Sequence, residues 1–166
     1  DLNVHHLIDI FAGEIEAEEI KNKVTNPLEG LKIAPYYGCQ IVRPRKNGEE
    51  VEDPQFFEEI LTALGADAID FAYKTRCCGG SLLLTNREAA LDMIQHLLRN
   101  AEKSGADVIA TACPLCQVNL EVYQTQVNEE FGTDYSIPVL YFTQIMGLAL
   151  GIAPKKLGIG SELVST

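Results

Sequence analysis

The chain has 166 residues, a formal net charge of −11 and an apolar content of 46%. This length suits one ordinary domain with a buried core, and apolar residues spread along the chain exclude a disordered protein. Nucleic acids and anionic membranes require a basic surface, so neither is an expected partner. No apolar stretch is long enough to cross a membrane, and we expect a soluble protein.

The beginning of the chain has the spacing of helices followed by a strand. Apolar positions in residues 1–30 predict a helical lead-in of two short helices that end before Pro27. Residues 31–37 are typical of a strand, and this strand leads directly into Gly38 and Cys39.

A turn and a helix follow the first cysteine. Residues 46–48 carry a turn signal, Asp53 suits a helix N-cap and Pro54 suits the first helical position. Apolar residues at helical spacing then continue to Gly65, where we expect the helix to end. The order of this first unit is strand, cysteine, helix.

The second unit repeats this order. Residues 67–72 predict a short strand, and the adjacent pair Cys77 and Cys78 follows it. Thr85 and Glu88 have the spacing of a capping box, which predicts the start of a long helix.

The third unit contains the remaining cysteines. Residues 107–111 predict a buried strand that runs into the Cys-x-x-Cys motif of Cys113 and Cys116, and one helix is expected from inside this motif to about residue 131. Residues 137–142 predict a fourth strand, with a helix over residues 143–150 behind it.

This alternation predicts an α/β fold of Rossmann-like type, with a parallel four-stranded sheet and helices on both faces. Each cysteine segment lies just past the carboxyl end of a predicted strand, where open α/β sheets collect their ligands. Residues near 39, 77 and 113 are therefore expected to converge at one edge of the sheet.

Five cysteines without a secretory signal favour a reduced, cytoplasmic metal or redox site over a disulfide scaffold. Four interpretations remain open. A structural zinc site would take Cys39, one of the adjacent pair and the Cys-x-x-Cys motif, whereas a thioredoxin-like pair would use Cys113 and Cys116 alone. A vicinal disulfide would join Cys77 and Cys78. An iron-sulfur cluster would use thiolates from all three segments.

The adjacent pair favours the cluster, because neighbouring cysteines project in different directions and cannot easily serve one metal ion. They could instead hold an extended cluster at two irons. Gly38, Gly79 and Gly80 would let the backbone approach such a cofactor and offer N–H groups to it. Cations close in sequence could offset the charge of the thiolates, namely Arg43, Lys74 and Arg76.

The cysteine segments resemble a known family. Tyr-Tyr-Gly-Cys at 36–39, Arg-Cys-Cys-Gly-Gly at 76–80 and Cys-Pro-Leu-Cys-Gln at 113–117 are similar to the cysteine-rich CCG domain in the B subunit of heterodisulfide reductase, and so is the closing stretch 138–151. The resemblance implies one CCG domain over residues 1–166. Because the chain has a single five-cysteine set, it also implies the C-terminal half of a longer protein with two such domains.

The resemblance also implies a function. In this family such a cysteine set binds a noncubane [4Fe-4S] cluster that serves the reductive cleavage of a disulfide substrate, the heterodisulfide of coenzyme M and coenzyme B. Electrons come from iron-sulfur and flavin-containing partner subunits, and the isolated domain is expected to be inactive alone. The implied ligands, with no catalytic residue beyond them, are Cys39, Cys77, Cys78, Cys113 and Cys116.

Two further expectations accompany this hypothesis. The cluster can be absent from a fragment purified in air, where adventitious zinc or disulfides can replace it. The alternative function is a non-enzymatic, zinc- or thiol-stabilised docking module of a larger redox complex.

Overall fold

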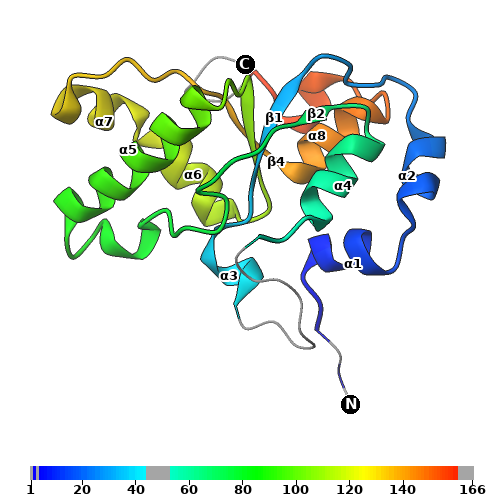
Figure 1. The fold of residues 1–166 in the computed structure, drawn as a ribbon, viewed down its shortest axis with the longest axis horizontal. Coiled ribbons are helices and arrows are strands. Elements are labelled where there is room, and N and C mark those ends of the chain that lie inside the picture. The colour runs from blue at the N-terminus through cyan, green and yellow to red at the C-terminus, as the bar shows by residue number, and fades with distance from the viewer. Residues whose placement is uncertain (1, 3, 44–52, 161–166) are drawn as a thin grey trace.

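The computed structural model describes residues 2, 4–43 and 53–160, so the turn predicted at residues 46–48 lies outside the described part of the chain. The described residues form a four-stranded sheet in the order β2-β1-β3-β4, and each neighbouring pair of strands is parallel. Helices lie on both sides of the sheet (Figure 1). The predicted α/β class, with a parallel sheet covered on both faces, is confirmed.

The two central strands are the most buried. β1 spans Lys32–Tyr36 and β3 spans Val108–Thr111, and both are buried nearly throughout because helices cover both faces of the sheet. The edge strands are β2, which spans Asp67–Ala68, and β4, which spans Val139–Tyr141.

Strand β2 ends earlier than its predicted range of 67–72. Behind it the chain turns, and Phe71 enters the apolar core on one face of the sheet. The carbonyl of Lys74 then accepts hydrogen bonds from the N–H groups of Tyr37 and Gly38. The segment after β2 thus packs against the end of β1 and does not extend the sheet.

Two groups of helices cover the two faces of the sheet (Figure 1). The first group is α1 (Leu7–Gly13), α2 (Ala17–Lys23), α4 (Phe56–Ala63) and α8 (Phe142–Ala149). The second group is α5 (Arg87–Lys103), α6 (Pro114–Val122) and α7 (Gln124–Phe131). The short helices are α3 (Gly38–Val42), η1 (Gly80–Leu82) and η2 (Pro154–Leu157). The two helices expected in the lead-in are α1 and α2.

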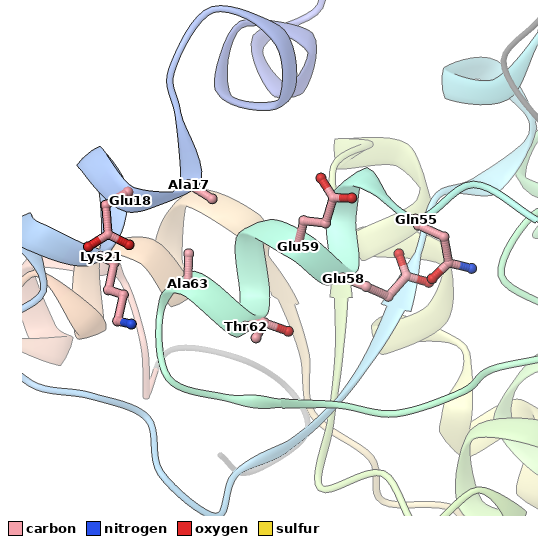
Figure 2. Close-up of a pocket in the computed structure, with 8 residues that line it drawn as sticks. All are labelled: Ala17, Glu18, Lys21, Gln55, Glu58, Glu59, Thr62 and Ala63. Carbon is pink, nitrogen blue, oxygen red and sulfur yellow. The ribbon is translucent and has the colours of Figure 1, made fainter.

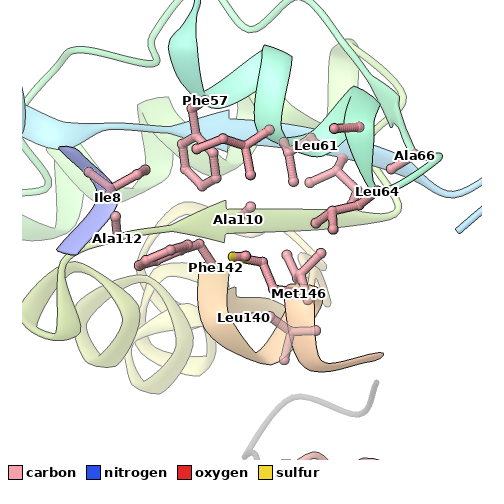
Figure 3. Close-up of a cluster of buried hydrophobic side chains, with 14 of the residues drawn as sticks. Ile8, Phe57, Leu61, Leu64, Ala66, Ala110, Ala112, Leu140, Phe142 and Met146 are labelled. Atoms are coloured by element: carbon pink, nitrogen blue, oxygen red, sulfur yellow. The ribbon is translucent and has the colours of Figure 1, made fainter. Parts of the chain in front are cut away.

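The sheet separates two apolar cores. Successive residues of a strand point to opposite faces, so Ile33 belongs to the core under α4 and α8, and Ala34 belongs to the core under α5. Figure 3 shows the first core, in which Phe57 and Leu61 of α4 lie on one side of Ala110, and Phe142 and Met146 of α8 lie on the other. The rings of Phe57 and Phe142 meet edge-on with their centres 6.3 Å apart.

The predicted N-cap of α4 is wrong. The helix begins at Phe56 after Gln55, so neither Asp53 nor Pro54 occupies the position expected from the sequence. The Asp53 carboxylate forms an ion pair with Lys74, and the Pro54 carbonyl accepts a hydrogen bond from the same ammonium group. Asp53 and Pro54 therefore interact with the buried Lys74 and do not form the start of the helix.

The predicted capping box of α5 is also wrong, by one residue. The cap is Asn86, whose Oδ1 accepts a hydrogen bond from the N–H of Ala89 at 3.2 Å. The hydroxyl of Thr85 donates to the carbonyl of Leu82 instead.

The single helix expected from the Cys-x-x-Cys motif to residue 131 is divided into α6 and α7 at Tyr123. The cause is the buried Gln124. Its side-chain amide donates to the carbonyl of Ile137 at 2.7 Å and accepts from the N–H of the same residue at 2.9 Å. This pair of hydrogen bonds ties the start of α7 to the segment before β4.

Candidate metal centre

The three cysteine segments lie past the carboxyl ends of three strands. Cys39 is in α3, directly after β1, and Cys77 and Cys78 are in the loop between β2 and η1. Cys113 is the N-cap of α6, and Cys116 is in the first turn of that helix, after β3. All five thiols are free, so the vicinal disulfide considered from the sequence is not formed in this structure.

Interactions between cysteines of different segments, together with the peptide bond between Cys77 and Cys78, connect the five thiols in a row. Cys78 and Cys116 are 38 positions apart in the chain, yet their Sγ atoms share a hydrogen bond at 3.5 Å. Cys39 lies close enough to Cys77, and Cys113 to Cys116, for each neighbour to raise the pKa of Cys39 or Cys116. The order along this thiol row is therefore 39, 77, 78, 116 and 113. Its middle is buried and its two ends are half-buried.

The two buried thiols in the middle of the row, Cys78 and Cys116, differ in how readily they ionise. The hydrogen bond with Cys116 lowers the pKa of Cys78 to about 6; burial opposes this shift, and the N–H of Gly80 and the amide of Asn119 support it. The same hydrogen bond, together with burial, raises the pKa of Cys116. A single negative charge on this pair is thus placed on Cys78, where neutral donors face it.

Glycine backbone borders the thiol row, at the positions singled out in the sequence. A Cβ atom on Gly38 would lie 3.2 Å from Sγ of Cys116, and one on Gly80 would lie 3.5 Å from Sγ of Cys78. The N–H of Gly79 donates a hydrogen bond to a cysteine sulfur at 3.4 Å. Side chains at Gly38 and Gly80 would take space next to the cysteine sulfur atoms.

The thiol row does not close around one point. Within the part of the chain that the structure describes, no three His, Cys, Asp or Glu side chains are arranged to hold one metal ion. Five sulfur donors from three segments, with glycine backbone beside them, suit a cofactor of several metal atoms better than one tetrahedral ion. The residues present are therefore consistent with a metal cluster.

Three side chains that the sequence did not single out hold the cysteine segments in place. The hydroxyl of Tyr36 donates to the carbonyl of Arg76 at 2.7 Å, and Nδ2 of Asn119 donates to the carbonyl of Cys78 at 2.6 Å. The hydroxyl of Tyr141 donates at 2.8 Å to the carbonyl of the residue before the Cys-x-x-Cys motif. No local pattern marks a tyrosine or an asparagine for such a contact between distant segments.

Lys74 does not act as a counter-ion for the thiolates, contrary to the expectation from the sequence. Its buried ammonium group lies 2.8 Å from Oε1 of Glu58 and also pairs with Asp53. Burial alone would lower the pKa of Lys74, but hydrogen bonds to these two carboxylates raise it above the ordinary value. The hydroxyl of Tyr37 donates a short hydrogen bond to the other oxygen of Glu58.

A groove of about 500 Å³ opens at one end of the thiol row. Cys39 and Cys77 line it, together with the two remaining cations of the sequence prediction, Arg43 and Arg76. Helix α5 contributes His96, among other residues, to the same groove. A small molecule can therefore reach half-buried thiols there. The carboxylate of Asp92 also lines the groove, but the two guanidinium groups outnumber it and favour an anionic molecule.

A second groove, of about 450 Å³, lies between α2 and α4 (Figure 2). Its charged lining is mostly acidic, with Glu18, Glu58 and Glu59 beside Lys21. It contains no cysteine and shares no lining residue with the first groove. Glu58 connects this groove to the cysteine segments only indirectly. Its carboxylate pairs with Lys74, and the carbonyl of Lys74 accepts hydrogen bonds from Tyr37 and Gly38.

The fold and the centre define a cysteine-rich α/β domain with its thiols at the carboxyl end of a parallel sheet. Residues 33–121 match the model of the CCG cysteine-rich domain family. The chain belongs to this family.

Similar proteins support the resemblance to heterodisulfide reductase. The chain is 42% identical over 165 residues to the B subunit of the ferredoxin/F(420)H(2)-dependent CoB-CoM heterodisulfide reductase of Methanosarcina acetivorans, covering 97% of this chain and 55% of that protein. It is 38% identical over 149 residues to the 8-methylmenaquinol:fumarate reductase membrane anchor subunit of Wolinella succinogenes, covering 89% of this chain and 52% of that protein. The chain thus spans about half the length of these curated relatives.

A solved structure shares the fold. A hypothetical protein from Helicobacter pylori superposes with a TM-score of 0.69 at 17% identity, covering 90% of this chain and 28% of that chain. Separately, none of the helices in the described ranges combines the length and apolar character that a membrane crossing needs.

Proposed function

We propose that Cys39, Cys77, Cys78, Cys113 and Cys116 bind a noncubane [4Fe-4S] cluster in a domain of a disulfide-reducing oxidoreductase. The observation that carries this proposal is the row of five thiols from three segments, linked through the contact of Cys78 with Cys116. When bound, the cluster would supply electrons for reduction of the substrate.

The residues of the chain have separate tasks in this proposal. The thiolates are the ligands, and Gly38 and Gly80 keep side chains away from the sulfur atoms. Arg43 and Arg76 in the groove attract an anionic disulfide to the half-buried end of the thiol row. Cleavage breaks the S–S bond and takes up two electrons and two protons, so that two thiols leave.

The proposal extends to the whole protein through its relatives. The Methanosarcina relative is named for CoB-CoM heterodisulfide, and its length leaves room for a second CCG domain beside the part that matches this chain. We assign to the whole protein a second CCG domain, iron-sulfur and flavin-containing partner subunits, and a disulfide substrate of this kind. The domain by itself then holds half of the active site and is inactive alone.

A second candidate function is a zinc- or thiol-stabilised docking module without enzymatic activity. Four of the five thiols could serve one zinc ion if the row closed around it. The arrangement of the side chains disfavours such a site, because within the described residues no three His, Cys, Asp or Glu side chains are placed to hold one metal ion.

Analysis of the full-length protein, prepared without air, separates the two candidates. The cluster predicts a brown protein with iron, inorganic sulfide and an electron paramagnetic resonance signal after redox adjustment. A colourless protein with tightly bound zinc, or with no metal and normal activity, would overturn the proposal.

The variants Cys77→Ser and Cys78→Ser sharpen this experiment. One zinc ion needs four ligands, so at least one of the two variants should keep its zinc. A cluster that uses all five thiols should be lost or spectroscopically altered in both variants. Retention of an unaltered iron-sulfur signal in either variant would show that the substituted thiol is not a ligand.

A further inference from the structure

Tyr36 brings a phenol group to the meeting point of the cysteine segments, and the proposed function gives it no role. It is the last residue of β1 and lies in register with Thr111 at the end of β3. Its side chain is fully buried on the face covered by α5, α6 and α7, and its ring meets Phe71 edge-on at 6.2 Å. The ring is thereby fixed in position.

The hydroxyl of Tyr36 bonds to one cysteine segment and lies near the two others. It donates a hydrogen bond to the carbonyl of Arg76 at 2.7 Å, directly before the adjacent pair of cysteines. A Cβ atom on Gly38 would lie 3.7 Å from this hydroxyl and 3.2 Å from Sγ of Cys116. The phenol therefore holds the second segment, and its hydroxyl and Sγ of Cys116 both lie next to Gly38 of the first segment.

The electrostatic surroundings of Tyr36 agree with this position. Burial and then the charges of nearby cysteines raise its pKa; these cysteines are Cys116, Cys78, Cys77 and Cys39 in order of effect. These four belong to all three segments. The phenol thus remains protonated at neutral pH and can keep donating its hydrogen bond to the carbonyl of Arg76.

We propose that Tyr36 is a positioning residue, whose hydroxyl fixes the segment of Cys77 and Cys78 relative to the other two cysteine segments. The hydrogen bond to Arg76 ties that segment to the rigid end of a central strand. This inference rests on the proposed cluster. Without this bond, the segment would still be held by the hydrogen bond from Asn119 to the carbonyl of Cys78, but it would lose its side-chain tie to β1.

The neighbouring Tyr37 offers a matched control. It is also fully buried, but its side chain lies in the core on the other face of the sheet. Its hydroxyl accepts a hydrogen bond from the N–H of Phe57 at 2.8 Å and donates one to Glu58. Tyr37→Phe therefore removes a phenolic hydroxyl of similar burial on the side of the sheet away from the thiol row.

The test compares wild type, Tyr36→Phe and Tyr37→Phe as full-length protein prepared without air. The measurements are the paramagnetic resonance spectrum, the midpoint potential, the rate of iron release to a chelator, and the midpoint of thermal unfolding. Tyr36→Phe is expected to change the spectrum and the potential and to release iron about fivefold faster, the factor that corresponds to one intramolecular hydrogen bond. Tyr37→Phe is expected to unfold at a lower temperature with the spectrum and release rate of wild type.

Two results would overturn the inference while the proposed function stands. One is a Tyr36→Phe protein with the spectrum and the iron release rate of wild type. The other is an equal change in both variants, because the effect would then follow general loosening of the fold. If wild type itself contains no iron and sulfide, the proposed function fails, and the inference fails with it.

Discussion

At the scale of single residues, the buried ammonium group of Lys74 is paired with carboxylates and not with the thiols, although it is close to the cysteines in sequence. Glu58 and Asp53 pair with it, and the backbone carbonyl of Pro54 accepts a third interaction. The sequence placed this lysine near the cysteines but could not reveal that two carboxylates, 16 and 21 positions away, would reach it first. Its expected contribution is to the stability of the fold.

Replacing Lys74 with methionine should lower the free energy of unfolding by about 3 kcal/mol, because the mostly buried Glu58 would lose its partner. The pKa of Lys74 is raised in the folded state, so this contribution is complete at pH values below the ordinary lysine pKa of 10.5 and is lost as the pH rises through the folded value. Urea unfolding of both proteins over a range of alkaline pH measures the difference.

The exposed Lys155 provides the control, and Lys155→Met should change stability by no more than about 0.5 kcal/mol. If the difference in unfolding free energy between wild type and Lys74→Met stayed constant well above pH 10.5, the loss would come from packing and not from charge.

At the scale of elements, the loop of the adjacent cysteines is shaped by its contact with α5. Gly79 has a positive φ of 76°, and a Cβ atom there would lie 3.1 Å from Cα of Ala90 and 3.3 Å from Sδ of Met93. The chain must turn in this conformation at this distance from the helix. The glycine is therefore required by backbone geometry and by packing together.

Gly79→Ala should destabilise the protein by about 2 kcal/mol, since left-handed strain adds to a close backbone contact. Gly105 has the same φ of 76° but no atom within 4 Å of its Cβ position. Gly105→Ala should then cost only the strain, about 1 kcal/mol. Thermal unfolding of the two variants isolates the packing contribution, and equal losses would contradict it.

The elements also show what local sequence can and cannot predict. Periodicity and turn residues placed the strands and most helices, because apolar spacing reports which face is buried. The division of α6 from α7 depends on Gln124 reaching the backbone of Ile137, 13 positions away. The cap of α4 depends on the ion pair of Asp53 with Lys74. Such contacts arise only after the chain has folded.

At the scale of the whole molecule, one sheet joins two cores and the cysteine segments. Convergence of these segments was predictable, because parallel strands bring their carboxyl ends to the same side of a sheet. The supports of the segments were not predictable, since Tyr36, Asn119 and Tyr141 each act on the backbone of another segment. The fold and the convergence of the cysteine segments can thus be predicted from sequence patterns. The tertiary contacts that hold these segments in place cannot.

Leu61→Ala should lower the free energy of unfolding by about 3 kcal/mol, because Leu61 is buried in the core under α4. Both cores share the central strands, so the arrangement of the thiols on the other face of the sheet should unfold in the same transition. In the metal-free protein, circular dichroism and the reactivity of the buried Cys78 and Cys116 are expected to give one urea midpoint.

Leu84, which is 98% exposed, supplies the comparison, and Leu84→Ala should leave the midpoint almost unchanged. Thiols that became reactive at lower urea than the loss of helix would show that the centre opens independently of the cores.

The short edge strands determine how another chain can approach this sheet. Of the described strands, β2 has two residues and β4 has three, and these two form the edges. Few N–H and C=O groups are left there to pair with a foreign strand, which protects the sheet from edge-to-edge aggregation. A partner that docks on this domain therefore has to recognise side chains, loops and helix surfaces, because adding a strand to the sheet offers it little.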